Sequence, residues 1–117
     1  MKPTKYTFNE TNKIDLGTKV IYKYPTPTND FDIAKMVIKG RSPEESSKFL
    51  LEHVCQFVML VTRGSGKVFT EAEVFEVTVD DVIFIPTECI FAVEGDFEYI
   101  TVDLPAFYPE QSEEVTS

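Results

Sequence analysis

The stretch that decides the fold is residues 64–91, which read GSGKVFTEAEVFEVTVDDVIFIPTECIF. It opens on a Gly-Ser-Gly turn at Gly64 after a long apolar run, and residues 65–79 separate that glycine from Asp80. β-Branched and aromatic residues dominate the stretch, and these residues favour strands over helices. Pro86 then follows an apolar segment and marks a turn before the next one. The stretch therefore predicts short strands joined by close turns.

Alternation of apolar residues extends this pattern over the rest of the chain. The strongest strand candidate is 49–62, where alternate residues from Leu51 to Val61 share one face. Residues 42–45, Ser-Pro-Glu-Glu, are typical of a helix start, although the pattern leaves room for only a turn or two of helix. Further strands are expected at 19–24, 31–39, 68–70, 74–79, 82–85, 90–93 and 97–104. About eight short strands with close turns predict an all-β sandwich or barrel.

Length and charge limit the domain organisation and the partners. The 117 residues fit one compact domain, which we place at 1–108 with its core at 32–107. The acidic residues 109–117 are expected to be a flexible tail. The net charge is −9, with all 11 Lys and Arg in residues 2–67 and 13 Asp and Glu in residues 71–117. No basic stripe is concentrated enough to bind nucleic acid.

The ends and the cysteines indicate a compartment. The N-terminus reads Met-Lys-Pro-Thr-Lys-Tyr and has no apolar segment behind it. No apolar stretch reaches the length of a membrane span. Cys55 and Cys89 do not make the disulfide framework of a small secreted domain. We therefore expect a cytoplasmic protein with two free thiols and no membrane partner.

The spacing between Asp80 and Phe91 resembles the second of two motifs found in the cupins, a superfamily of small jelly-roll barrels. That motif has a glycine, a proline six residues later, another glycine and then a metal-binding histidine. The matching positions here are Asp80, Pro86, Glu88 and Phe91. The resemblance covers about 32–107 and implies an all-β fold, a cupin-like jelly-roll β-barrel of two antiparallel sheets.

The first cupin motif has two metal-binding histidines and a metal-binding glutamate before its glycine. Counting back from the Gly-Ser-Gly turn, these positions hold Leu51, His53 and Phe57, so His53 alone keeps a ligand side chain. Leucine and phenylalanine cannot donate to a metal. The resemblance therefore implies a metal-free barrel without a cofactor. A rebuilt zinc or iron site from His53, Cys55 and Cys89 stays an alternative.

An apolar and aromatic barrel interior suits a small, partly apolar molecule or a sugar. Binding of such a metabolite without turnover is the first functional hypothesis. The expected pocket residues are Leu51, Cys55, Phe57, Met59 and Phe91.

Catalysis by the single histidine is the second hypothesis, because imidazole titrates near neutral pH. Some metal-free cupins are carbohydrate epimerases and ketoisomerases that use His with Tyr or Asp. The resemblance thus offers His53 as acid or base, with Tyr99 or Asp103 as its partner. A redox or metal protein is a third class, and whether the chain is an enzyme stays open. As many small cupins pair, a homodimer through the apolar outer face of one sheet is also expected.

Overall fold

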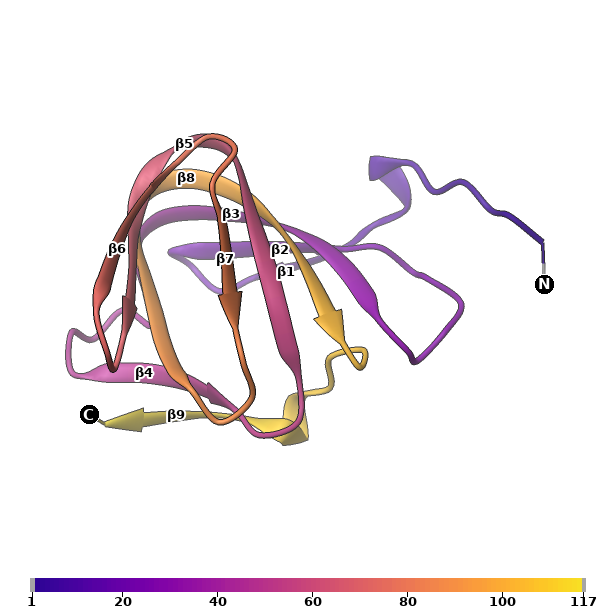
Figure 1. Ribbon diagram of the computed structural model, residues 1–117. Helices are drawn as coiled ribbons and strands as arrows, with labels where there is room; N and C mark the ends of the chain where they lie inside the picture. The colour runs from indigo at the N-terminus through magenta and orange to yellow at the C-terminus, as the bar shows by residue number, and fades with distance from the viewer. Residues whose placement is uncertain (1, 117) are drawn as a thin grey trace.

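The computed structural model describes residues 2–116, which form an almost entirely β-sheet molecule (Figure 1). Two short 3-10 helices, η1 and η2, flank the strands, and no helix of the described residues has the length and hydropathy to span a membrane. The fold is the all-β jelly-roll barrel that the sequence predicts. In chain order the elements are η1 (Phe8–Glu10), β1 (Asn12–Asp15), β2 (Lys19–Lys23), β3 (Asp32–Ser42), β4 (Lys48–Glu52), β5 (Gln56–Thr70), β6 (Val74–Thr78), β7 (Val82–Ile85), β8 (Ile90–Leu104), η2 (Pro109–Gln111) and β9 (Ser112–Thr116).

Two long strands, β5 and β8, form the centre of the barrel. They pair antiparallel from Gln56 opposite Leu104 to Thr70 opposite Phe91. β8 also pairs with β3 and, near its start, with β4. The sheet continues from β3 through β2 to β1 and from β4 to β9, while β6 and β7 pair with β5. In Figure 1, β5 and β8 arch over the top of the barrel and β4 and β9 cross its lower end.

The arch explains why two predicted turns are absent. The sequence predicts turns at 64–66 and 94–96, but β5 and β8 run through these positions. Gly64 has a φ of 75°, and a β-carbon there would collide with the carbonyl oxygen of Asp96. The glycine therefore lets two strands bend in close contact instead of ending one of them.

Two more local predictions are wrong. The single strand predicted at 49–62 is divided into β4 and β5 by residues 53–55. The helix predicted at 42–45 is absent: Ser42 is the last residue of β3, and a bend follows at 43–45. Its backbone is fixed from outside, because Nη1 of Arg41 donates to the carbonyl oxygens of Pro43 and Glu45.

Residues 109–116, which belong to the acidic end that the sequence predicts to be a flexible tail, contain η2 and β9. Within the described residues, β9 pairs with the whole of β4. The buried Gln111 anchors it: its side-chain oxygen accepts hydrogen bonds from the N–H groups of Val54 and Cys55, both at 3.1 Å. Its carbonyl oxygen accepts another from the N–H of His53 at 2.8 Å. The N–H groups of the β4–β5 loop need acceptors, and Gln111 supplies them. These hydrogen bonds therefore attach β9 to the loop.

Apolar side chains from β3, β5, β6, β7 and β8 form one buried core. The rings of Phe57 and Phe91 meet in it edge to face, with 5.0 Å between their centroids. Two of the positions that the cupin resemblance gives to metal ligands thus do converge inside the barrel. Both positions hold phenylalanine, whose ring has no atom that can bind a metal.

Candidate functional site

The barrel contains a cavity of about 310 Å³. This volume lies at the lower end of the range for small-molecule sites, roughly 300–1,000 Å³. Ile14 and Leu16 line it while remaining 44% and 56% exposed, so its mouth lies beside β1. The other apolar lining residues include Ile21, Ala34, Met36, Leu50, Phe57, Phe91 and Phe107.

Strand register places the polar side chains of the cavity. Tyr99, Thr101 and Asp103 are alternate residues of β8, so they lie on the same face, which is buried and lines the cavity. On the neighbouring β3, Asp32 lies opposite Asp103 and Ala34 lies opposite Thr101. The small side chain of Ala34 leaves space beside the threonine hydroxyl.

The carboxylate of Asp32 is firmly held on one side. Its Oδ2 lies 3.1 Å from Nζ of Lys23 and accepts a hydrogen bond from the N–H of Phe107 at 2.8 Å. An ion pair with a hydrogen bond is the usual condition for burying a charge. Asp32 is therefore oriented by its surroundings before any ligand arrives.

Burial changes the acidity of the neighbouring groups. It is the largest cause that raises the pKa of Asp103 to about 8, followed by the charges of Glu52 and Asp32 and by a side-chain hydrogen bond with Asp32. Burial also raises the pKa of Glu52, against the hydrogen bond from Gln111. It lowers the pKa of Lys19, against the attraction of Glu52 and Asp103. Asp103 is consequently a neutral acid at pH 7.

Apart from the hydrogen bond that Asp32 shares with neutral Asp103, two buried oxygens of the cavity residues have no partner within the described chain, Oδ1 of Asp32 and Oγ1 of Thr101. Both residues are 3% exposed. Buried polar atoms are nearly always paired, and an unpaired one costs about 1–3 kcal/mol. Such atoms on the wall of a cavity indicate a site for a hydrogen-bonding molecule.

His53 does not line the cavity, where the sequence predicts it. Its side chain is 39% exposed, with Nδ1 2.9 Å from Oε1 of Glu88 and Nε2 2.8 Å from Oε2 of Glu113. These hydrogen bonds, the one to Glu113 first, raise the pKa of His53. The loop between β4 and β5 breaks the alternation of faces, so that Glu52 lies inward and His53 outward. His53 ties this loop to β9.

The other predicted site residues divide into two groups. Phe57 and Phe91 line the cavity, as do the proposed partners Tyr99 and Asp103. The cavity is not lined by the other three, Leu51, Cys55 and Met59. Leu51 lies on the opposite face of β4 from Glu52, and Met59 is buried in the core.

The alternative metal site from His53, Cys55 and Cys89 is not assembled. Residues 2–116 contain no group of three or more His, Cys, Asp and Glu arranged to hold a metal ion. The thiol of Cys55 donates to the carbonyl oxygen of Pro105 at 3.3 Å, and burial raises its pKa to about 12. Cys89 packs against the core. Cys55 therefore lacks the low pKa of a reactive thiol.

Lys19, Asp32 and Glu52 were missed as site residues. A signal existed for Asp32, which shares one face of its strand with Ala34 and Met36. A charged residue on an apolar face is rarely buried unless it has a partner. No such signal exists for Glu52, because its face depends on the loop that follows it.

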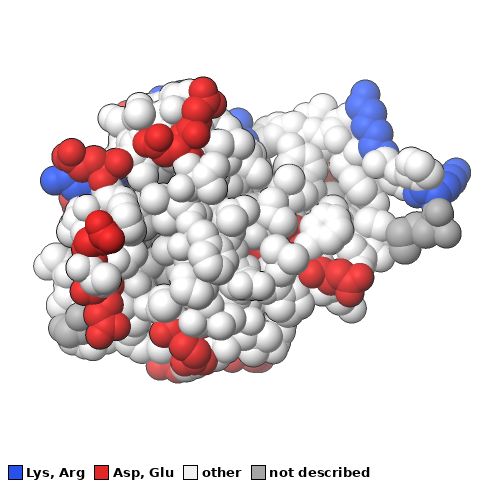
Figure 2. Space-filling model, in the orientation of Figure 1, with Lys and Arg blue, Asp and Glu red and all other residues white. Residues whose placement is uncertain are grey.

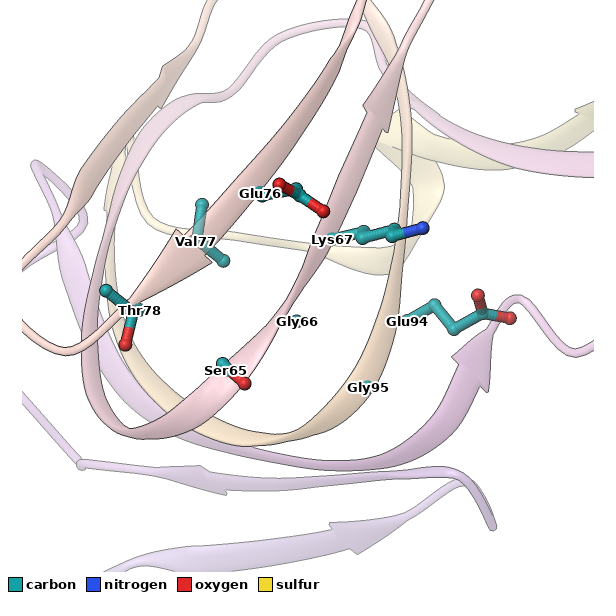
Figure 3. A pocket seen from close by; sticks show the side chains of 8 residues that line it. All are labelled: Ser65, Gly66, Lys67, Glu76, Val77, Thr78, Glu94 and Gly95. Carbon is teal, nitrogen blue, oxygen red and sulfur yellow. The ribbon is translucent and has the colours of Figure 1, made fainter.

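A second hollow lies on the outside of the barrel, between β5, β6 and β8 (Figure 3). Its volume is about 490 Å³, and Gly66 and Gly95 lie at its centre. The side chains of Lys67 and Glu94 extend away from these glycines (Figure 3). All polar side chains around it are exposed and need no ligand as a partner. The barrel cavity is therefore the candidate site.

Strands, closure and cavity define a small β-barrel with an internal cavity. Comparison with solved structures shows that its fold is that of the cupins. No protein-family model and no curated protein matches the sequence.

Three solved structures illustrate the similarity. A variant of Streptomyces PAC13 with uridine has a TM-score of 0.86 and 16% identity, over 97% of this chain and 92% of that one. Pac13 is described as a nucleoside dehydratase. Ectoine synthase from P. lautus has a TM-score of 0.76 and 12% identity, over 98% and 91%. An RmlC-like cupin from Shewanella frigidimarina has 0.72 and 15%, over 90% and 93%.

Proposed function

We propose that this chain is a small-molecule-binding protein whose ligand, an uncharged molecule rich in hydroxyl groups such as a sugar or nucleoside, occupies the barrel cavity. The observation that carries this proposal is the pair of unpartnered oxygens, Oδ1 of Asp32 and Oγ1 of Thr101. A carboxylate oxygen accepts a hydrogen bond and a hydroxyl donates or accepts one, so ligand hydroxyls satisfy both.

The charges of the cavity favour a neutral ligand. Lys23 is paired with Asp32, and Lys19 lies in the field of Glu52 and Asp103. The positive charges are thus balanced, and a phosphate would face three carboxyl groups. The apolar wall offers a surface for the flat face of a base or a sugar ring.

The comparisons support the same class of ligand by analogy of fold. One neighbour was obtained with uridine, and another is a synthase of a small molecule, ectoine. The analogy adds to the geometry of the cavity.

Replacing Thr101 by valine tests the proposal, because it removes the hydroxyl and keeps the shape. We expect binding to weaken about tenfold, since one hydrogen bond contributes roughly 1–1.5 kcal/mol. Isothermal titration calorimetry with uridine, ribose and fructose as probes measures this change. His53→Ala is the control and should bind like the wild type, because His53 lies outside the cavity. If the wild type binds none of the three probes, or if Thr101→Val binds them equally well, the proposal fails.

We also propose that two copies of the chain form a homodimer through an apolar face on β5 and β7. Val58, Leu60, Val82 and Phe84 are 36–57% exposed, and Val58 lies opposite Phe84 as Leu60 lies opposite Val82. In Figure 2 the surface over β5 and β7 is free of charge, and acidic residues lie around it. A contiguous exposed apolar patch is typical of a protein–protein contact, and a two-fold axis would bury the same patch of both copies.

Phe84→Lys is expected to weaken this dimer at least about 100-fold, because it places a charge at the centre of the contact and removes an aromatic anchor. Analytical ultracentrifugation over a range of concentrations measures the change. Val74→Lys is the matched control, since Val74 is also exposed, at 52%, but lies on β6 outside this face. A wild type that sediments as a monomer at every concentration contradicts the dimer.

A further inference from the structure

Two carboxyl groups of the cavity form a pair with unequal surroundings. Asp32 and Asp103 lie opposite each other on β3 and β8, are 3% and 8% exposed, and both line the cavity. Lys23 and the N–H of Phe107 hold Oδ2 of Asp32, whereas its Oδ1 has no partner in the described chain. The oriented carboxylate of Asp32 can therefore accept either a ligand hydroxyl or the proton of neutral Asp103, with which it shares a hydrogen bond.

Asp103 has no ion pair of this kind among the described residues. The titratable groups that act on it or feel its charge come from every element around it: Lys19 on β2, Asp32 on β3, Glu52 on β4, Cys55 in the β4–β5 loop and Tyr99 on β8. Burial and the two acidic neighbours favour its neutral form, and its pKa of about 8 agrees with this geometry. Adjacent buried carboxyls do not both ionise readily, so the pair retains one proton at neutral pH.

We propose that Asp32 and Asp103 act as a base and an acid on a bound hydroxy ketone or hydroxy aldehyde, so that the chain is an enzyme as well as a binding protein. The proposal rests on the binding site proposed above. It transfers the acid–base role from His53, which lies outside the cavity, to two residues that line it.

The step needs no oxidant, reductant or cofactor. Oδ1 of Asp32 removes the proton from the carbon next to the carbonyl group, and the electrons of that C–H bond form a C=C bond. The C=O π electrons take the proton of Asp103, and the product is an enediol. Asp32 is now protonated and Asp103 ionised. Return of a proton from Asp32 to either enediol carbon, with recovery of a hydroxyl proton by Asp103, gives the substrate or its isomer and restores the pair.

Hydrogen exchange with solvent measures this step directly. The wild type is incubated in D₂O with dihydroxyacetone and with erythrulose, and NMR follows loss of the C–H signal next to the carbonyl. Calorimetry measures the binding of the same compounds. We expect Asp32→Asn and Asp103→Asn each to lower the exchange rate at least about 100-fold, the usual size of an acid or base contribution. Binding should weaken by no more than about tenfold, because asparagine keeps the shape but replaces one acceptor oxygen by an NH₂ donor, which affects about one hydrogen bond. The loss of exchange rate should therefore exceed the loss of affinity.

The pH profile separates a chemical role from a structural one. Exchange by the wild type should fall above about pH 8, where Asp103 loses its proton. ¹³C NMR of labelled aspartate carboxyls should show one group titrating in this range, and that signal should be lost in Asp103→Asn. Two carboxyls that are both ionised at pH 6 would overturn the pair.

The remaining outcomes are also distinct. Binding of the probes without exchange overturns the acid–base pair and leaves the binding site intact. Failure of the wild type to bind either hydroxy ketone overturns the acid–base pair, whereas the binding site falls only if uridine, ribose and fructose also fail to bind. His53→Ala should exchange like the wild type; if it loses exchange and the two Asn variants keep it, the acid or base is His53.

Discussion

Replacing Gly64 by alanine is expected to lower the free energy of unfolding by about 2–5 kcal/mol. The φ of 75° places this residue in the left-handed region, which costs a residue with a β-carbon about 1–2 kcal/mol. The new β-carbon would also collide with the carbonyl oxygen of Asp96 and lie 3.0 Å from Cα of Phe97. Both atoms belong to β8, so the two central strands must separate at their bend, and overpacking adds about 1–3 kcal/mol. Urea unfolding followed by circular dichroism measures the loss.

Gly17→Ala is the matched control for this substitution. Gly17 also has a positive φ, 85°, but the nearest atom to its β-carbon is Oε1 of Glu44 at 3.1 Å, the end of an exposed and flexible side chain. The control should therefore lose only the backbone part, about 1 kcal/mol. Equal losses in the two variants would show that close contact between β5 and β8 does not require glycine at 64.

The same glycine shows how far the fold could be predicted. Alternating burial is a local property of a strand, so the barrel, the hairpin of β5 and β6 and most strand positions follow from the sequence. A glycine between two apolar runs is equally typical of a turn and of a bend. The choice between them depends on β8, which lies about 30 residues further on and bends with β5 at the same place. No local pattern contains that information.

The site was predictable to the same degree. Phe57, Tyr99 and Asp103 lie where alternation along a continuous strand puts them. The prediction for His53 is wrong because three loop residues, 53–55, separate β4 from β5 and change the phase. Asp32 meets Asp103 only through the register of β3 against β8. Pairing between strands distant in sequence therefore determines the acid pair, and a single sequence does not specify that pairing.

The second large effect is expected from Asp103→Asn, which should make the protein more stable in alkaline solution. The pKa of Asp103 rises from 3.8 to about 8 on folding, so the folded state binds more protons than the unfolded state between these values. The free energy of unfolding of the wild type therefore falls as the pH rises through this window. If Asp103 titrated alone, the free energy of unfolding would fall by roughly 1.4 kcal/mol for each pH unit within this window. Because Asp103 is coupled to Asp32 and Glu52, we expect a total fall on the order of 2–4 kcal/mol between pH 5 and 9. Asparagine is neutral throughout, so the variant should exceed the wild type by about that amount at pH 9 in urea unfolding.

Other titratable groups of the cavity also make the stability depend on pH. The raised pKa of Glu52 gives a slope of the same sign, and the lowered pKa of Lys19 gives the opposite one, but both remain in the variant. Asp96→Asn is the control, since the side chain of Asp96 is 74% exposed and its loss should leave the pH slope unchanged. A slope in Asp103→Asn as steep as that of the wild type would mean that Asp103 is ionised in the folded protein and cannot donate a proton. A variant that gains stability at pH 9 and loses hydrogen exchange would show instead that this buried acid is retained for chemistry at the expense of stability.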